Sequence, residues 1–255
     1  MHGIEIRRLC QELRLFGIQD SFETRSAAAQ AEGQPPEDFL TRLLEDERMH
    51  RRNAKARLLD HQAQFRRNSY LEKWDNTFER GLSKAKLREL STLSFWQDKA
   101  NLILTGGTGS GKTELSIILG KQACQAQLSV KFTSVSSFFE EAESLRAAGK
   151  IRTWFSKQKK YDIVVFDDFG LRTYSHEEAI LLLDFLEERY QKKVHIFSSQ
   201  VEVEGWRSLF EDPVVADALI DRIKNPSQKI KITGSSYRER LGLKSLTPPQ
   251  SLTQN

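Results

Sequence analysis

From residue 98 onward, apolar residues follow two alternating patterns. Short continuous apolar runs, such as residues 163–166, are typical of parallel strands that are buried on both faces. Between them, apolar residues recur every three or four positions, which predicts helices. Alternation of strand and helix predicts an α/β fold with a parallel sheet flanked by helices and right-handed crossovers. The expected strands are residues 101–105, 129–134, 161–167, 194–199 and 228–233, and the expected helices lie near 112–126, 136–148, 176–191 and 213–224.

Residues 4–90 contain no strand-like run and predict a domain built of helices alone. The first helix is expected over residues 4–15, where Gly17 closes it, and the second over residues 21–31. A third opens at Pro36 or the next residue, since proline is tolerated in a first helical turn, and continues into the sixties. The chain therefore divides near residue 95. Apolar residues that share a helix face are Ile4, Leu9, Leu13 and Phe16 in the first helix, and Phe39, Leu40, Leu43 and Leu44 in the third.

A phosphate-binding motif follows the first expected strand and opens the next helix. It fills the pattern G-x-x-x-x-G-K-[ST] without a mismatch, in the strand-turn-helix context that the motif requires. Its glycines let backbone N–H groups point at a phosphate, and the helix N-terminus adds partial positive charge. Lys112 is expected to reach the β- and γ-phosphates, and the Thr113 hydroxyl to bind Mg²⁺. The motif consists of Gly106, Gly107, Thr108, Gly109, Ser110, Gly111, Lys112 and Thr113.

A pair of acidic residues, Asp167 and Asp168, ends the expected central strand. Carboxylates at the carboxyl end of a parallel strand face the ligand crevice of the sheet. We expect Asp167 to hold Mg²⁺ through water, and Asp168 to polarise the water that attacks the γ-phosphate. Alone, such residues would more often serve solubility. Together with the phosphate-binding motif, they favour a nucleotide site.

Composition limits the remaining possibilities. The chain has 255 residues, a formal net charge of +4 and a pI of about 9.0, which is a weak pointer to a polyanionic partner. Cys10 and Cys124 lack metal-ligand spacing and suit a reducing cytoplasm, where both would be packing residues. No signal peptide and no membrane-spanning run is apparent, so we expect a cytoplasmic protein without membrane contact.

The end of the third expected helix is basic. Arg48, Arg51, Arg52 and Lys55 are spaced so that they share one helix face. Such a face could neutralise successive phosphates of nucleic acid, or it could be an ordinary solvated surface. Since no base-reading motif accompanies it, any DNA contact should be largely independent of sequence. Further basic residues follow at Arg57, Arg66 and Arg67.

Three further groups stand where an ATPase would use them. The fourth strand ends in polar residues 198–200, one of which could orient the attacking water. Arg222 lies off the apolar face of its helix, where it could pair with Asp221 or Asp217, or reach a neighbour's γ-phosphate as an arginine finger. An arginine of residues 236–240 could fold back onto the phosphates or form a salt bridge.

The order of these motifs resembles IstB-like AAA+ ATPases, the helper proteins of insertion sequences that also encode an IstA transposase. They are relatives of the helicase loader DnaC and of DnaA. The resemblance covers nearly the whole chain: residues 12–18 and 39–47 resemble the helical domain, and residues 78–96 the linker that cups the nucleotide. The remaining matches are VVFDDFGLRTYS to the Walker B region, FSSQVEVEGW to the sensor strand and DPVVADALIDRI to the arginine-finger helix.

The resemblance implies a fold, a set of roles and a set of partners. The sheet should have the order 5-1-4-3-2, with Ser199 as sensor, Arg222 as finger and Arg238 as second sensor. The family binds ATP and Mg²⁺, forms ATP-dependent homo-oligomers on double-stranded DNA, bends that DNA and directs its transposase. Hydrolysis acts as a switch.

The resemblance also implies a domain plan, and this sequence departs from general AAA+ practice in two ways. The plan is a helical domain over residues 1–75, a linker over 76–97, an AAA+ domain over 98–243 and a disordered tail over 244–255. Asp168 replaces the glutamate of many relatives, and its shorter side chain predicts slow hydrolysis. Few residues follow the last strand, so little or no C-terminal lid is expected, which puts Arg238 in doubt.

In relatives, DNA contacts come from the N-terminal helices and from loops that face a central channel. Binding through such residues should weaken steeply with salt. The corresponding candidates are Arg51, Arg52, Lys55, Arg57, Lys150, Arg152, Arg172, Thr173 and Ser175.

Three functions remain open from the sequence. The favoured one is a DNA-binding ATPase that selects the target and assists a transposase. The second is a helicase loader of the DnaC type, which the N-terminal domain must separate from the first. The third is a P-loop kinase of a small molecule, which would need a substrate pocket and would not need Arg222 in a neighbouring subunit.

Overall fold

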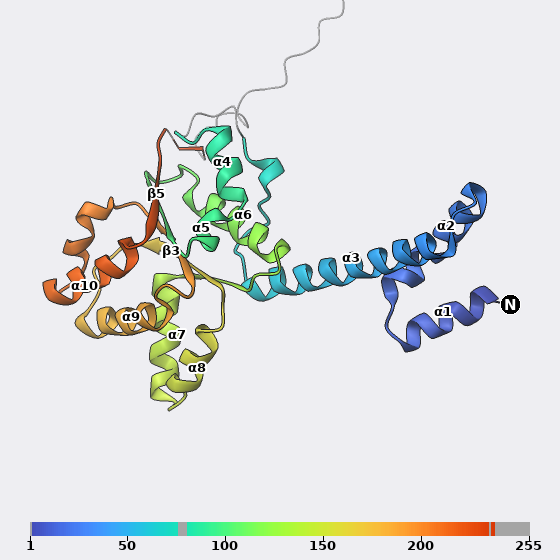
Figure 1. Cartoon of the computed structure of the whole chain (residues 1–255). Coiled ribbons are helices and arrows are strands. Elements are labelled where there is room, and N and C mark those ends of the chain that lie inside the picture. The colour runs from blue at the N-terminus through green and yellow to red at the C-terminus, as the bar shows by residue number, and fades with distance from the viewer. Residues whose placement is uncertain (1, 76–80, 235, 238–255) are drawn as a thin grey trace, which may run out of the picture. The chain divides into compact units, whose positions relative to one another are not determined.

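The structure, a computed structural model, describes residues 2–75, 81–234 and 236–237 (Figure 1). Contacts divide it into two compact units. The first contains residues 1–59 with 125–127, and the second begins at Asp60 and holds the rest of the described chain. Residues 60–75 therefore group with the second unit by contacts. The functional roles expected for the domains stay predictions. Residues 76–80 of the expected linker and the lid and tail region after residue 237 lie outside the described residues.

The first unit consists of helices α1 (His2–Glu12), α2 (Phe16–Glu32) and most of α3 (Pro36–Ala63). Gly17 does not close α1, contrary to our expectation, but lies in the first turn of α2. The backbone N–H of Gly17 donates to the buried carboxylate of Glu47, at 2.7 Å. A Cβ at this position would come within 2.7 Å of the Asp46 carbonyl oxygen. Gly17 is thus required for close packing of two helices, because only glycine leaves room for that approach.

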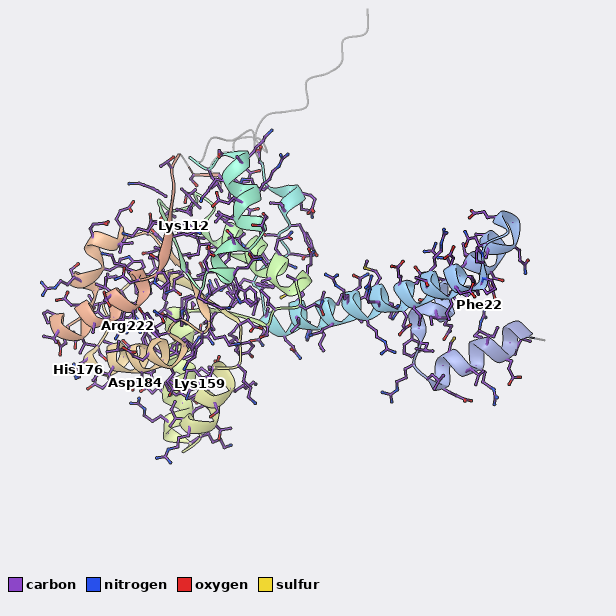
Figure 2. All side chains as sticks on the ribbon, viewed as in Figure 1. Phe22, Lys112, Lys159, His176, Asp184 and Arg222 are labelled. Atoms are coloured by element: carbon purple, nitrogen blue, oxygen red, sulfur yellow. The ribbon has the colours of Figure 1, made fainter. Side chains whose placement is uncertain are left out.

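A small apolar core holds these helices together. It contains Cys10, Ile18 and Leu43, and Phe22 (labelled in Figure 2) and Phe39 pack against it. The ring centroids of the two phenylalanines lie 6.0 Å apart. The apolar residues predicted to share a face of the first helix are instead largely exposed. The exposed fractions are 80% for Ile4, 42% for Leu9, 64% for Leu13 and 45% for Phe16.

A five-stranded parallel sheet forms the centre of the second unit (Figure 1). Its order is β2-β3-β4-β1-β5, which confirms the predicted 5-1-4-3-2 arrangement. Every residue of β1 and β4 is buried, as expected for inner strands covered on both faces. The strands are β1 (Asn101–Gly106), β2 (Val130–Ser134), β3 (Ile163–Phe169), β4 (Val194–Ser199) and β5 (Ser227–Ile232).

The helices expected near residues 112–126, 136–148, 176–191 and 213–224 are all present in the second unit. Helix α8 (Ile151–Gln158) was not expected. It is short, and its buried apolar side chain is Trp154. One face of the sheet packs against α7, α9 and α10 through an aromatic-rich core that includes Phe138, Phe166 and Phe185. The other elements are η1 (Leu71–Lys73), α4 (Lys84–Ser91), α5 (Ser94–Gln97), α6 (Lys112–Gln125), α7 (Val135–Ala147), α9 (His176–Arg189), η2 (Val203–Leu209) and α10 (Pro213–Lys224).

Over the ranges that the structure describes, no helix is both long and apolar enough to cross a bilayer.

A buried arginine joins the amino ends of the central strands. Arg189 is 1% exposed, and its guanidinium donates to the carbonyls of Gln158 and Tyr161 at 3.1 and 2.8 Å. Its Nε donates to Nε2 of His195 at 2.9 Å, and His195 Nδ1 lies 3.0 Å from Asn101 Oδ1. These two contacts require the neutral imidazole with its proton on Nδ1. Burial, and secondly the Arg189 charge, hold the pKa of His195 well below its ordinary value.

The free energy of unfolding is therefore expected to fall as the pH drops below about 6.5. There the unfolded chain gains a proton on His195 that the folded chain cannot accept, which costs up to about 1.4 kcal/mol per pH unit. Urea denaturation between about pH 7 and pH 5.5 measures this slope, within the titration range of free histidine. The slope measures how many protons the chain takes up on unfolding. Since glutamine cannot titrate, His195→Gln should lower that number by about one. An identical slope in both proteins would show that His195 is not its source.

Candidate nucleotide site

The phosphate-binding loop joins β1 to α6 and has the backbone that its glycines allow. Gly106, Gly109 and Gly111 have φ angles of 150°, 74° and 108°. A Cβ at Gly106 would lie 2.1 Å from the carbonyl oxygen of Ile232 on the neighbouring strand β5. Only glycine fits this contact, so it lets the end of β1 lie against the backbone of β5 where the loop begins.

Lys112 begins α6 and extends over the loop. Its side-chain Nζ donates to the carbonyls of Gly106 and Gly107, both at 2.8 Å, and the residue is only 8% exposed. The ammonium group is therefore held within the loop itself. This places a positive charge where the motif requires one for a bound phosphate.

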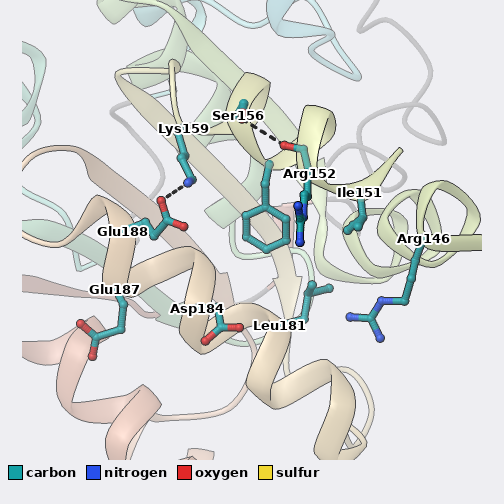
Figure 3. A pocket seen from close by; sticks show the side chains of 10 residues that line it. Arg146, Ile151, Arg152, Ser156, Lys159, Leu181, Asp184, Glu187 and Glu188 are labelled. Atoms are coloured by element: carbon teal, nitrogen blue, oxygen red, sulfur yellow. Dashed lines mark hydrogen bonds and ion pairs between the residues drawn. The ribbon is translucent and has the colours of Figure 1, made fainter. Parts of the chain in front are cut away.

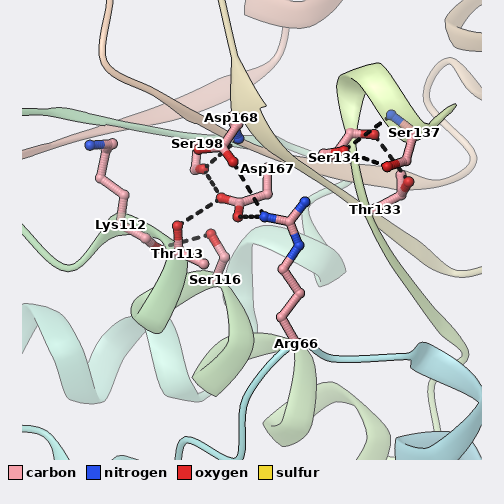
Figure 4. Close-up of polar contacts among 10 residues, drawn as sticks. All are labelled: Arg66, Lys112, Thr113, Ser116, Thr133, Ser134, Ser137, Asp167, Asp168 and Ser198. Carbon is pink, nitrogen blue, oxygen red and sulfur yellow. Dashed lines mark hydrogen bonds and ion pairs between the residues drawn. The ribbon is translucent and has the colours of Figure 1, made fainter. Parts of the chain in front are cut away.

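Asp167 lies in the interior beside the loop, at 0% exposure (Figure 4). Its Oδ1 accepts hydrogen bonds from the hydroxyls of Thr113, at 2.9 Å, and of Ser198. Its Oδ2 is buried and has no hydrogen-bond partner among the described residues. Burial raises the pKa of this carboxyl above its ordinary value, the Asp168 charge raises it further, and the two hydroxyls oppose the rise.

These oxygen atoms fit a magnesium ion. Mg²⁺ prefers oxygen ligands and is usually held by one or two protein groups together with substrate phosphates. The Thr113 hydroxyl and the Asp167 carboxylate are in direct contact, and one Asp167 oxygen is left without a donor. The donor set at this point is thus suited to Mg²⁺ bound with a nucleotide.

Asp168 adopts a left-handed backbone conformation, with a φ of 60°. The register between β3 and β4 shifts here, between Phe166 and Phe169. The Asp168 N–H donates to Ser198 Oγ at 3.3 Å. This conformation is uncommon for residues other than glycine, although aspartate tolerates it better than most.

A cleft of about 410 Å³ opens over the loop and lies within the usual size range of small-ligand sites. Tyr237 closes part of it, since its N–H donates to the Gly109 carbonyl at 3.0 Å. The cleft is lined by Arg67, Ser69, Thr108, Gly109, Gly111, Lys112, Thr113, Glu114, Asp168, Gln200 and Tyr237.

Three adjacent polar residues at the end of β4 make different contacts. Ser199, the expected sensor, is fully buried, and its hydroxyl accepts from the Val201 N–H at 3.1 Å; it does not line the cleft. Ser198 instead contacts both acidic residues of β3. Gln200 lines the cleft, and its Oε1 accepts from the Thr108 hydroxyl at 2.7 Å. The sequence marked this polar strand end but could not show which side chain faces the cleft.

Arg222 lies far from the cleft of its own subunit. The Arg222 carbonyl accepts from the Asn101 side chain at 3.3 Å, at the amino end of β1, whereas the phosphate-binding loop begins at its carboxyl end. The guanidinium pairs with Asp221, as one alternative proposed, and also with Glu187, at 3.0 and 2.6 Å. It does not line the nucleotide cleft. Arg238 lies outside the described residues.

The candidate DNA contacts of the first unit are exposed, but one has a structural partner. Arg51 donates to Glu47 at 2.7 Å, and Glu47 in turn accepts from the backbone of α2. Arg52, Lys55 and Arg57 have exposed side chains on the same helix.

The candidate DNA contacts of the second unit fall into two groups. Lys150 and Arg152 are exposed at the start of α8. Arg172 instead forms an ion pair with Glu178, and Ser175 caps α9, so these two have structural partners; Thr173 is exposed.

A second groove, of about 600 Å³, lies between α8 and α9 (Figure 3). Arg152 lines it on one side, and Asp184 and Glu187 line it on the other. Lys159 pairs with Glu188 across it. Because acidic side chains line this groove, it lacks the uniformly positive lining of a nucleic-acid groove.

Several solved structures share the fold of about two thirds of this chain. DnaI is 18% identical with a TM-score of 0.56, over 65% of this chain and 92% of that one. The DnaC helicase loader is 17% identical with a TM-score of 0.50, over 64% and 99%. AMPPCP-bound DnaA from Aquifex aeolicus is 20% identical with a TM-score of 0.50, over 62% and 49%. They confirm the predicted AAA+ fold for the part of this chain that they cover.

Sequence relatives cover nearly the whole chain. An ATP-binding protein of insertion sequence IS21 from Pseudomonas aeruginosa is 29% identical over 240 residues, or 93% of this chain and 89% of that protein. An insertion-sequence ATP-binding protein of Mycobacterium tuberculosis is 29% identical over 239 residues, or 92% and 94%. The family model of IstB-like ATP binding proteins matches residues 8–245. The chain therefore belongs to the family of IstB-like ATP binding proteins.

Proposed function

We propose that this protein is an ATP-hydrolysing regulator of transposition that assembles on double-stranded DNA and recruits and stimulates an IstA-type transposase. The observation that carries the proposal is one cleft lined by Lys112, Thr113 and Asp168, with Asp167 hydrogen-bonded to Thr113, in a chain of the IstB-like family. ATP binding and hydrolysis would act as the switch between assembled and released states.

Each side chain of the cleft has a task in this proposal. The loop N–H groups and Lys112 bind the β- and γ-phosphates. Thr113 and Asp167 would hold Mg²⁺, which when bound supplies positive charge against the phosphate oxygens. Asp168 orients the attacking water and accepts its proton, and Gln200 is placed to contact the γ-phosphate. The short side chain of Asp168 holds that water less closely than glutamate, so basal hydrolysis should be slow and increased by DNA or a partner.

Arg222 supports a homo-oligomer. A side chain at the opposite end of β1 from the phosphate-binding loop cannot serve its own nucleotide. It can serve the nucleotide of a neighbouring copy as an arginine finger. In the single subunit, Glu187 and Asp221 hold the guanidinium in place. Exchange of these surface partners for a phosphate costs little free energy, because exposed ion pairs contribute little stability.

Basic residues support the DNA partner. Arg52, Lys55 and Arg57 form one exposed group on α3, and Lys150 and Arg152 form another at α8. Such groups neutralise phosphates without reading bases, so binding should be largely independent of sequence. Variants of Arg52 and Lys55 test the first group more cleanly than variants of Arg51, whose side chain also holds Glu47.

Particle size on duplex DNA tests the proposal. With ATP and Mg²⁺, the wild type should form large closed assemblies, seen by electron microscopy or light scattering. Asp168→Asn should bind ATP but hydrolyse it about 10²–10⁴ times more slowly, because the general base is lost. Its assemblies should therefore persist after the wild-type assemblies have disappeared.

Lys112→Ala is the matched control, since it loses the phosphate contact and should not assemble. A wild type that remains monomeric on duplex DNA in every condition would contradict the proposal. Assembly on a replicative helicase without response to duplex DNA would instead favour the alternative, a helicase loader of the DnaC type.

A further inference from the structure

Arg66 contacts the acidic pair of the nucleotide site although it belongs to none of the motifs. Its guanidinium lies 3.3 Å from Asp168 Oδ2 and 3.6 Å from Asp167 Oδ2 (Figure 4). The sequence grouped Arg66 with the basic residues that could contact DNA. In the structure it faces two carboxylates of its own subunit, from a segment about a hundred residues away along the chain.

The segment that carries Arg66 is anchored on both sides. Phe65 packs edge-on against Phe132 of β2 at a centroid distance of 5.9 Å, and the Arg66 guanidinium lies over the same ring, also at 5.9 Å. Lys121 of α6 donates to Asn68 at 2.8 Å and is only 6% exposed. The backbone around Arg66 is thus tied to the helix that follows the phosphate-binding loop, while its side chain remains about half exposed.

The charge of the site explains why a cation lies here. Two adjacent aspartates repel each other, and one of them is fully buried. The Asp167 oxygen nearest Arg66 is the one without a hydrogen-bond partner among the described residues. Arg66 therefore supplies positive charge to the same carboxylate that is suited to hold Mg²⁺. Two cations at one carboxylate repel each other, so Arg66 and Mg²⁺ oppose each other's binding.

We propose that Arg66 is a resident cation of the ATPase site, which holds Asp167 and Asp168 in place and which Mg²⁺ must displace. This inference rests on the proposed ATPase function. It assigns Arg66 a positioning role: the side chain acts through the two carboxylates. The consequence is a built-in opposition between Arg66 and the metal, which limits how much Mg²⁺ can strengthen nucleotide binding.

The opposition can be measured as a magnesium gain. We define this gain as the dissociation constant for a fluorescent ATP analogue in EDTA divided by the constant in saturating Mg²⁺. Without metal, the Arg66 charge attracts the polyphosphate; with metal, the same charge opposes the metal complex. Arg66→Gln should therefore raise the gain by about threefold to tenfold, the range for a partly exposed charge pair.

Two variants control for other effects. Arg67→Gln removes an equal charge from the lining of the same cleft. It should raise the dissociation constants in EDTA and in Mg²⁺ by the same factor, and so leave the gain within about twofold of the wild type. Arg66→Lys keeps the charge and should also retain a near wild-type gain. Thermal denaturation checks that each variant is folded, which we expect because the Arg66 side chain is half exposed.

The outcomes separate this inference from the proposed function. A gain in Arg66→Gln that equals or falls below that of the wild type overturns the inference, as does an equal rise in Arg66→Lys. A wild type that binds the analogue in neither condition overturns the ATPase proposal itself. A wild type that binds with a gain above unity leaves that proposal standing whatever Arg66→Gln does.

Discussion

Replacement of Arg222 by alanine is expected to lower the ATPase rate of the DNA-bound assembly by about 10³-fold or more. The finger would stabilise charge on the transferred phosphoryl group, where a guanidinium acts only in the assembled state. Nucleotide affinity of the single subunit should not change, because Arg222 does not line its own cleft. Phosphate release under single-turnover conditions and equilibrium binding of a fluorescent ATP analogue measure the two quantities separately.

Mixing two inactive variants tests whether the finger works between subunits. Arg222→Ala retains an intact nucleotide site, and Asp168→Asn, which should still bind ATP and assemble, retains an intact finger. Mixed assemblies should therefore regain part of the activity that each variant lacks alone. Arg207→Ala is the matched control, since Arg207 forms an exposed ion pair with Asp217 of the same helix as Arg222, and it should remain near the wild-type rate. If mixing restores nothing and Arg222→Ala already weakens ATP binding by the single subunit, the residue does not act in a neighbouring site.

Replacement of Arg189 by leucine is expected to lower the free energy of unfolding by about 3–5 kcal/mol, the usual cost of breaking a buried network that involves a charge. Arg189 is 1% exposed, and burial lowers its pKa to about 9. Leucine would leave His195 Nε2 and the carbonyls of Gln158 and Tyr161 without a donor in the interior. Each such group costs roughly 1–3 kcal/mol.

Equilibrium urea denaturation measures this loss. Arg207→Leu, which replaces an exposed arginine, should change stability by no more than about 1 kcal/mol. Arg189→Lys should lie between the wild type and Arg189→Leu, because it keeps a donor but loses the planar fork that reaches several carbonyls at once. A loss of under about 1 kcal/mol in Arg189→Leu would mean that the network contributes little to folding.

Local sequence signals predicted the sheet and the centre of the nucleotide site. Continuous apolar runs mark β1 and β3, whereas β5 alternates polar and apolar residues. The order of the strands follows from the AAA+ resemblance that the motifs carry. The glycine-rich loop and the acidic pair Asp167 and Asp168 are each contiguous in sequence. Since each segment follows a strand of one parallel sheet, we expected both at the ligand crevice. The hydrogen bond from Thr113 to Asp167 shows that they meet there.

Signals at the ends of elements were less reliable. Gly17 reads as a helix terminator, but the buried Glu47 binds its N–H inside the next helix. The apolar stripe of the first helix, which includes Ile4 and Leu13, predicts burial that the first unit does not provide. The first error arose because a tertiary contact overrode a local glycine signal, and the second has a different origin. Periodicity tells which residues share a face, but not whether anything covers that face.

The amino-acid sequence by itself determined that this chain has a parallel α/β sheet, a phosphate-binding loop and two aspartates at the end of a central strand. Periodicity and contiguous motifs encode these features within a few residues. Only the tertiary structure decided that Arg66 faces the aspartates, that Ser198 joins them and that Gln200 rather than Ser199 lines the cleft. These contacts join residues that are remote in sequence, so they arise only when packing has brought their segments together.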